Sequence, residues 1–125
     1  MNKLANILIC DDSNLIRKQL RNTLEKEKHT VFETTSLKQI KGNTFSGDIT
    51  LKDINLVFLD IYLKNDSGFQ ILSYLKDNQP DIPVIMISVD NKKKIIFRAL
   101  IFGAVDYILK PFDEKLLIEK TNKAL

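Results

Sequence analysis

The stretch that decides the fold of this chain is ILICDDS, residues 7–13, in which four apolar residues are followed by two carboxylates and a hydroxyl. A short run that is almost wholly apolar is typical of a β-strand covered on both faces. Ser13 is then a favourable N-cap, because Ile16, Leu20 and Leu24 recur behind it at helical spacing. The stretch therefore predicts a buried strand, a polar turn and a helix.

Strands and helices alternate in the same way along the rest of the chain. The expected strands are Ala5–Cys10, Thr30–Thr34, Leu56–Leu59, Pro83–Ser88 and Ala104–Leu109. The expected helices are one after Ser13, a short one with Leu37 and Ile40, one from Gly68 that Pro80 stops, one from a cap at Asn91 to Gly103, and one from Pro111 to Leu125. Residues 36–53 are the least readable, with a loop expected at Gly42, Asn43, Ser46 and Gly47. The alternation predicts an α/β fold, a doubly wound parallel sheet with helices on both faces.

The composition is that of one globular domain, which we expect to span residues 1–125. Apolar residues make up 44% of the chain, which argues against disorder, and a net charge of +3 is too small to imply nucleic acid or an anionic membrane. No apolar run approaches the ~18 residues of a membrane span, so we expect a cytoplasmic protein. Cys10, the single cysteine, is expected to be a buried structural thiol. The single histidine, His29, excludes a histidine-rich zinc site and is expected at the surface.

Polar residues stand where four of the predicted strands end. Asp11 and Asp12 follow the first strand, Asp60 follows the third, Ser88 ends the fourth and Lys110 follows the fifth. In open parallel sheets, ligands bind outside the carboxyl ends of the strands. The topology therefore predicts that three carboxylates, a hydroxyl and an ammonium converge at one edge of the sheet.

This combination of groups suits metal-assisted phosphoryl transfer. Neighbouring carboxylates repel one another, so they need a cation to stay ionised together. Mg²⁺ prefers a few carboxylates, waters and a phosphate oxygen to a full protein cage. One carboxylate can then attack phosphorus and form an aspartyl phosphate, while a lysine and a hydroxyl stabilise the phosphoryl oxygens.

The chain resembles the receiver domains of two-component response regulators over nearly its whole length. The resemblance is carried by ILICDDS at residues 7–13, LVFLD at 56–60 with Gly68 eight residues later, VIMIS at 84–88 and GAVDYILKPF at 103–112. It implies a five-stranded, flavodoxin-like sheet of order 2-1-3-4-5 and a switch that a sensor histidine kinase or phosphotransfer protein phosphorylates. Such a domain catalyses its own phosphorylation and dephosphorylation but is not a turnover enzyme.

The resemblance also implies a role for each site residue. Asp60 is the expected phosphoacceptor and a Mg²⁺ ligand, and Ser88 and Lys110 are expected to bind the phosphoryl group. The other expected contributors to the metal site are Asp12 as a direct ligand, Asp11 largely through water, and the backbone carbonyl of Tyr62. Tyr107 matches an aromatic that turns inward when the hydroxyl engages phosphate, and a cis peptide is expected between Lys110 and Pro111.

This chain departs from the family pattern at four positions. Val89 stands where a very small residue is usual, and we expect its bulk to slow labelling. Lys64 replaces a common proline. Tyr62 and Asp90 occupy positions that tune hydrolysis of the aspartyl phosphate.

The helix after Asn91 has more apolar residues than a single core-facing stripe requires. We expect Lys93, Ile96 and Leu100, beside Tyr107, to form the output surface and possible homodimer contact. The run Lys92–Lys94 is better explained as a solvated helix start than as a basic patch.

Three alternatives differ in class from a phosphorylated switch. A Mg²⁺-dependent phosphohydrolase with an aspartyl nucleophile normally has a second Asp two residues later, where this chain has Tyr62. A nucleotide-binding domain needs a glycine-rich loop after the first strand, where this chain has DDSN at residues 11–14. A receiver-like interaction module that works without phosphate remains open, because of Val89. Contact with nucleic acid is expected only through a separate domain outside this chain.

Overall fold

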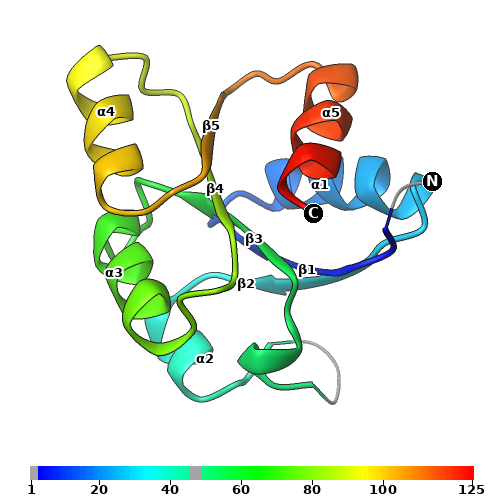
Figure 1. The fold of residues 1–125 in the computed structure, drawn as a ribbon, viewed down its shortest axis with the longest axis horizontal. Coiled ribbons are helices and arrows are strands. Elements are labelled where there is room, and N and C mark those ends of the chain that lie inside the picture. Colours follow the sequence, from blue (N-terminus) through cyan, green and yellow to red (C-terminus); the bar gives the residue numbers. More distant parts are fainter. Residues whose placement is uncertain (1–2, 46–48) are drawn as a thin grey trace.

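A computed structural model describes residues 3–45 and 49–125, which form one sheet flanked by helices (Figure 1). The strands are β1 Asn6–Cys10, β2 Thr30–Thr34, β3 Leu56–Asp60, β4 Val84–Ser88 and β5 Asp106–Leu109. The helices are α1 Asn14–Lys26, α2 Leu37–Lys41, α3 Gly68–Asn78, α4 Lys93–Ile101 and α5 Glu114–Ala124, with a 3₁₀ turn η1 at Leu51–Asp53. All four strand pairs are parallel in the order β2-β1-β3-β4-β5, which confirms the predicted fold class.

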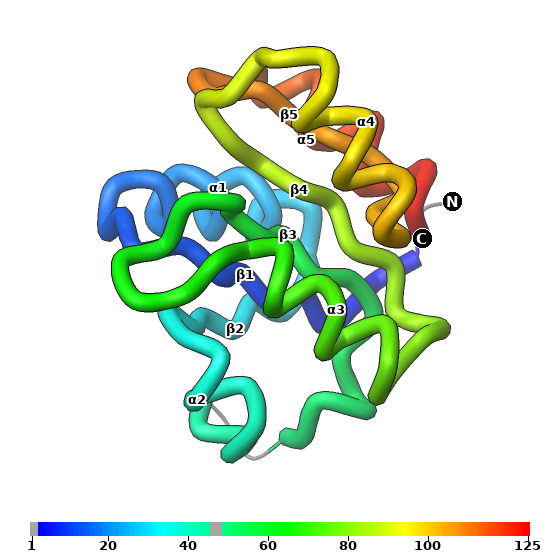
Figure 2. Tube along the Cα trace, turned by 90° about the vertical axis from the view of Figure 1, so that its left-hand side faces the viewer, coloured from blue at the N-terminus to red at the C-terminus, as the bar shows by residue number. Residues whose placement is uncertain are grey.

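Successive residues of each strand point to opposite faces of the sheet, so the bare apolar strands feed two cores. Ile7 and Ile9 of β1 belong to one core, which α1 and α5 cover. Leu8 and Cys10 belong to the other, which α2, α3 and α4 cover (Figures 1 and 2). Cys10 is fully buried and burial raises the pKa of its thiol, which confirms the prediction of a structural cysteine.

Two predicted helix starts are wrong. The fourth helix begins at Lys93 with Lys92 at the N-cap, not with a cap at Asn91, and no side chain caps it. The fifth begins at Glu114 rather than Pro111, because the Asp113 carboxylate accepts a hydrogen bond from Lys115 N at 3.1 Å and caps the first turn. The expected cis peptide between Lys110 and Pro111 is present.

The segment before β3 contains one element that the sequence did not reveal. The short helix α2 is present as predicted, with Ser36 as its N-cap. The missed element is η1, which a capping box stabilises, since Asp53 Oδ2 accepts a hydrogen bond from Thr50 N at 3.0 Å. Two of the expected loop residues, Ser46 and Gly47, lie outside the described residues.

The expectation that His29 is a surface residue is wrong. His29 is only 5% exposed, and its Nδ1 accepts a hydrogen bond from Ala5 N at 3.1 Å. Burial disfavours the charged imidazolium and lowers the pKa of His29. The histidine therefore joins the start of the β1 segment to the start of β2 as a neutral acceptor. Within the described residues, no helix combines the length and the apolarity needed to cross a membrane.

Candidate functional site

Backbone pairing at the carboxyl edge of the sheet brings the predicted site residues together. Asp60 is the last residue of β3 and is in register with Ile87 of β4. One residue past β5, Lys110 N donates to Ser88 O at 2.8 Å. One residue past β1, Asp11 N donates to the β2 carbonyl of Thr34 at 3.2 Å. The ladders therefore fix where these side chains leave the sheet, as the strand-end rule predicted.

Lys110 bridges two of the three carboxylates. Its Nζ lies 2.7 Å from Asp11 Oδ2 and 3.1 Å from Asp60 Oδ2, and all three side chains are almost fully buried. Burial opposes the ammonium charge, but the hydrogen bond and charge of Asp11 and the charge of Asp60 outweigh it and raise the pKa of Lys110. Burial also raises the pKa of Asp60, an effect that Lys110 opposes and Asp11 reinforces. The site therefore holds mutually repelling acids around one cation.

The third carboxylate, Asp12, is held by the loop after β3. Its Oδ2 accepts a hydrogen bond from Lys64 N. In the same loop, Tyr62 N donates to Asp60 Oδ1 at 3.3 Å. The Lys64 contact could not be predicted from the sequence, because any residue can supply a backbone N–H donor. The loop thus contacts both carboxylates that were predicted to bind metal directly.

The residues at this edge of the sheet offer oxygen atoms as possible ligands for Mg²⁺. In residues 3–45 and 49–125, no three acidic, histidine or cysteine side chains are grouped as a ready-made metal site. The donors nevertheless suit the ion in kind, since the carboxylates of Asp11, Asp12 and Asp60 and the Tyr62 carbonyl are hard oxygen ligands. Three carboxylates against the single ammonium of Lys110 also leave two negative charges, which a divalent cation would balance. The residues therefore fit Mg²⁺ by chemistry and charge.

Gly68 has a steric role in the site. A Cβ at this position would lie 2.2 Å from Asp60 O and 2.6 Å from Ile61 Cα, far inside contact distance. Gly68 N also donates to Ile61 O at 2.7 Å, which draws the start of α3 against the end of β3. The glycine eight residues after Asp60 therefore permits the close approach of two backbone segments.

Asp90 connects Ser88 to two tyrosines. Its backbone N donates to Ser88 Oγ at 3.2 Å, and its carbonyl accepts from Tyr107 OH at 2.7 Å. Its carboxylate accepts from Tyr62 OH and pairs with Lys92 Nζ at 3.1 Å, and the Tyr62 hydrogen bond contributes most to lowering the pKa of Asp90. The sequence placed Tyr62 and Asp90 near the site but did not reveal that they are bonded to each other. Lys92 is accounted for by this carboxylate, which offsets an unfavourable charge at a helix start.

The predicted output residues differ in exposure. Lys93 is exposed and Leu100 is 45% exposed, whereas Ile96 packs partly against the core. Tyr107 was predicted to belong to the same surface, but it is only 8% exposed, so its ring contributes little to the exposed face of α4 and β5. Val89 is 70% exposed, which places its isopropyl group at the surface beyond β4 rather than in the packed interior.

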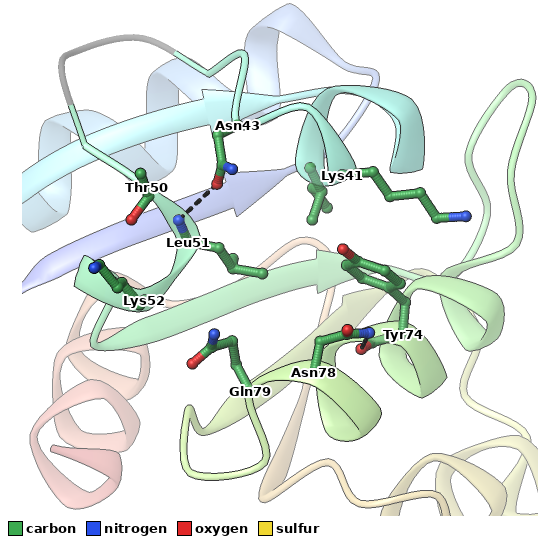
Figure 3. A pocket seen from close by; sticks show the side chains of 9 residues that line it. Lys41, Asn43, Thr50, Leu51, Lys52, Tyr74, Asn78 and Gln79 are labelled. Atoms are coloured by element: carbon green, nitrogen blue, oxygen red, sulfur yellow. Dashed lines mark hydrogen bonds between the residues drawn. The ribbon is translucent and has the colours of Figure 1, made fainter.

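A separate cavity of about 220 Å³ lies away from the site, between α2, η1 and the end of α3 (Figure 3). Its wall includes Leu51, Tyr74 and Asn78, and Asn43 Oδ1 holds Leu51 N at 2.8 Å across its rim. None of the predicted site residues lines it.

Known proteins similar to this chain share one type of domain. A family model described as the response regulator receiver domain matches residues 7–122. The chain is 33% identical over 98% of its length to the response regulator SaeR of Staphylococcus epidermidis, of which it covers 51%. It is 32% identical over 97% of its length to the DNA-binding transcriptional regulator NtrC of Rhizobium meliloti, of which it covers 24%. The chain therefore spans about half the length or less of these curated relatives.

Solved structures also resemble this chain over almost its whole length. NtrX from Brucella abortus, crystallised with ADP, superposes with a TM-score of 0.85 at 31% identity over 98% of this chain and 26% of its own. A CheY-like receiver domain protein from Methanospirillum hungatei superposes with a TM-score of 0.80 at 26% identity, over 97% of this chain and 93% of its own.

Proposed function

This chain belongs to the response regulator receiver family of two-component signalling, and on that premise we propose that it accepts a phosphoryl group on Asp60 with Mg²⁺ bound beside it. The donor is a sensor histidine kinase or a phosphotransfer protein. The observation that supports this most is the buried Lys110 ammonium, 2.7 Å from Asp11 and 3.1 Å from Asp60. An ion pair so buried is costly to build, and it puts a cation where phosphoryl oxygens would arrive.

In the proposed reaction, an Asp60 carboxylate oxygen forms a bond to phosphorus as the bond from phosphorus to the donor nitrogen breaks. The donor nitrogen leaves with that electron pair. Lys110 attracts the phosphoryl oxygens, and the Ser88 hydroxyl donates to one of them. Asp11, Asp12, Asp60 and the Tyr62 carbonyl would hold Mg²⁺, which supplies charge neutralisation at the transferring group. The chain acts as a switch rather than as a turnover enzyme.

We propose that the signal passes through Ser88 and Asp90 to the face of α4 and β5. When Ser88 Oγ turns to phosphate, it gives up the hydrogen bond from Asp90 N, and the Asp90 backbone, whose carbonyl accepts from Tyr107 OH, can then shift against the Tyr107 ring. The differential contact that biases the two states is thus the bond from Ser88 to phosphate. The surface that changes comprises Lys93, Ile96 and Leu100, with Tyr107 behind it.

This face is also the proposed homodimer contact. Light scattering on wild type and Leu100→Glu, each with and without beryllofluoride and Mg²⁺, tests it. Beryllofluoride should raise the association of wild type and not of Leu100→Glu. Equal association of the two proteins would rule this face out as a dimer contact.

We also propose that the chain lies in the cytoplasm and that any contact with DNA is made by a separate domain.

Intact mass after incubation with acetyl phosphate and Mg²⁺ tests the phosphoacceptor. We expect a gain of one phosphoryl group that hydroxylamine removes, because an acyl phosphate is cleaved by this nucleophile and a serine ester is not. Asp60→Asn should gain nothing, and the control Asp77→Asn, an exposed acid on α3, should label like wild type. A mass gain in Asp60→Asn, or one that resists hydroxylamine, would contradict the assignment.

A further inference from the structure

A cleft of about 460 Å³ lies beside the site, between the loop after β3 and helix α4. Figure 1 shows α3 and α4 next to each other on the same side of the sheet. The apolar part of the lining consists of Ile61, Leu63, Phe69 and Ile95, and the basic part of Lys64 and Arg98. This volume is within the range of clefts that bind ligands. The cleft lies on the α3 side of α4, away from Lys93 and Leu100.

Arg98 is held in place in this cleft by aromatic contacts. Its guanidinium carbon lies 4.3 Å from the centre of the Phe69 ring and 5.3 Å from that of Phe102. The two rings meet edge to face at 5.8 Å, so they form a fixed support. Stacking fixes the plane of a guanidinium and leaves its N–H donors available at the edges.

The basic side chains of the cleft are not paired with acidic side chains. Within the described residues, Arg98 and Lys64 make no salt bridge. Helix α4 contributes Lys93, Lys94 and Arg98 and has no acidic residue. Asp66 also lines the cleft, but its Oδ2 accepts a hydrogen bond from Leu37 N at 3.0 Å and faces α2. A preorganised guanidinium above an apolar floor, with no acidic partner, is complementary to a carboxylate attached to an apolar group.

We infer that this cleft binds an acidic peptide segment of a partner protein, with an apolar side chain on its floor and a carboxylate on Arg98. A second carboxylate lies within the field of Lys64 and Lys94. The peptide contacts the loop whose Lys64 N–H holds Asp12 and whose Tyr62 N–H reaches Asp60. Peptide binding therefore involves the loop that contacts Asp12 and Asp60, although peptide binding does not require phosphorylation of Asp60.

Fluorescence anisotropy tests whether the cleft binds an acidic peptide. The probe is a labelled synthetic peptide that contains one Leu and one Phe flanked by Asp and Glu. We expect Arg98→Gln to weaken binding about tenfold, the loss typical of a charge-assisted hydrogen-bonded pair. Lys18→Gln is the control, since it removes one positive charge from an exposed side chain of α1, and it should change affinity by less than about twofold. A peptide with Asn and Gln in place of Asp and Glu should not bind, and amide NMR shifts should map to residues 61–69 and 95–98.

Three results would overturn the inference. Equal weakening by Arg98→Gln and Lys18→Gln would mean that only net charge is sensed. NMR shifts confined to the Leu100 face would place the peptide elsewhere. Absence of peptide binding, together with self-association that Arg98→Gln removes, would assign the cleft to a second copy of the chain. Circular dichroism of each variant establishes that it is folded before binding is compared.

Discussion

Replacing Gly68 with alanine should both destabilise the protein and disturb Asp60, the proposed phosphoacceptor. The added methyl would lie 2.2 Å from Asp60 O, whereas ordinary contact begins at 3.4 Å, so the two backbone segments must separate by roughly 1 Å. Overpacking of this kind costs about 1–3 kcal/mol. The higher helix propensity of alanine offsets at most about 1 kcal/mol of this cost. We expect a net loss of about 1–2 kcal/mol, since the atoms in the way are backbone and cannot rotate aside.

Gly42→Ala is the matched control for this substitution. Gly42 caps α2 with φ of −86°, and its nearest neighbour to an added Cβ is Lys38 O at 3.4 Å. Alanine fits this conformation, so the substitution should be neutral or stabilise by about 0.5 kcal/mol through the unfolded state.

Urea denaturation and thermal melts of both variants measure the effect. A loss of 1–2 kcal/mol corresponds to a fall in Tm of roughly 4–8 °C in a domain of this length. Labelling by acetyl phosphate should slow in Gly68→Ala and not in Gly42→Ala, because only the first moves Asp60. If Gly68→Ala unfolds at the same urea concentration as wild type, the close approach at this glycine is not required and the reasoning fails.

Three further substitutions test the electrostatics. Without metal, Asp60→Asn should be more stable than wild type by about 1 kcal/mol. The pKa of Asp60 is raised in the folded protein, so its ionisation costs stability as pH rises through the pKa of the folded state, and asparagine removes this cost. Mg²⁺ should raise the Tm of wild type more than that of the variant. Lys110→Met should cost about 3 kcal/mol in urea denaturation, since it leaves Asp11 and Asp60 buried without a cation, and adding Asp60→Asn should recover part of this loss. Wild type should lose stability as pH falls below about 6.5, because His29 is protonated in the unfolded chain while its lowered pKa keeps it neutral in the folded protein. The free energy of unfolding of His29→Gln should fall less over the same pH range. An equal pH slope for the two proteins would assign the acid sensitivity to other groups.

The sequence by itself determined the order of the strands and main helices and the meeting of Asp11, Asp60 and Lys110 at one edge of the sheet. Apolar runs and helical spacings are local signals, and parallel strands must present their carboxyl ends at one edge, so Asp60 and Lys110 had to lie near each other. Ser13 was correctly identified as a cap because its signal lies within one helical turn. The glycine spacing at Gly68 was visible too, although its steric reason was not.

Only the tertiary structure decided which side chains meet across segments far apart in the chain. His29 accepts a hydrogen bond from Ala5 N, 24 residues away, and the hydrogen bond from Tyr62 to Asp90 joins residues 28 positions apart. The stacking of Arg98 on Phe69 likewise joins α4 to α3, and no local sequence pattern predicts that these two helices pack side by side. Periodicity fixes the face from which a side chain leaves its element, but contact depends on the packing of elements against each other, which is set by the whole core.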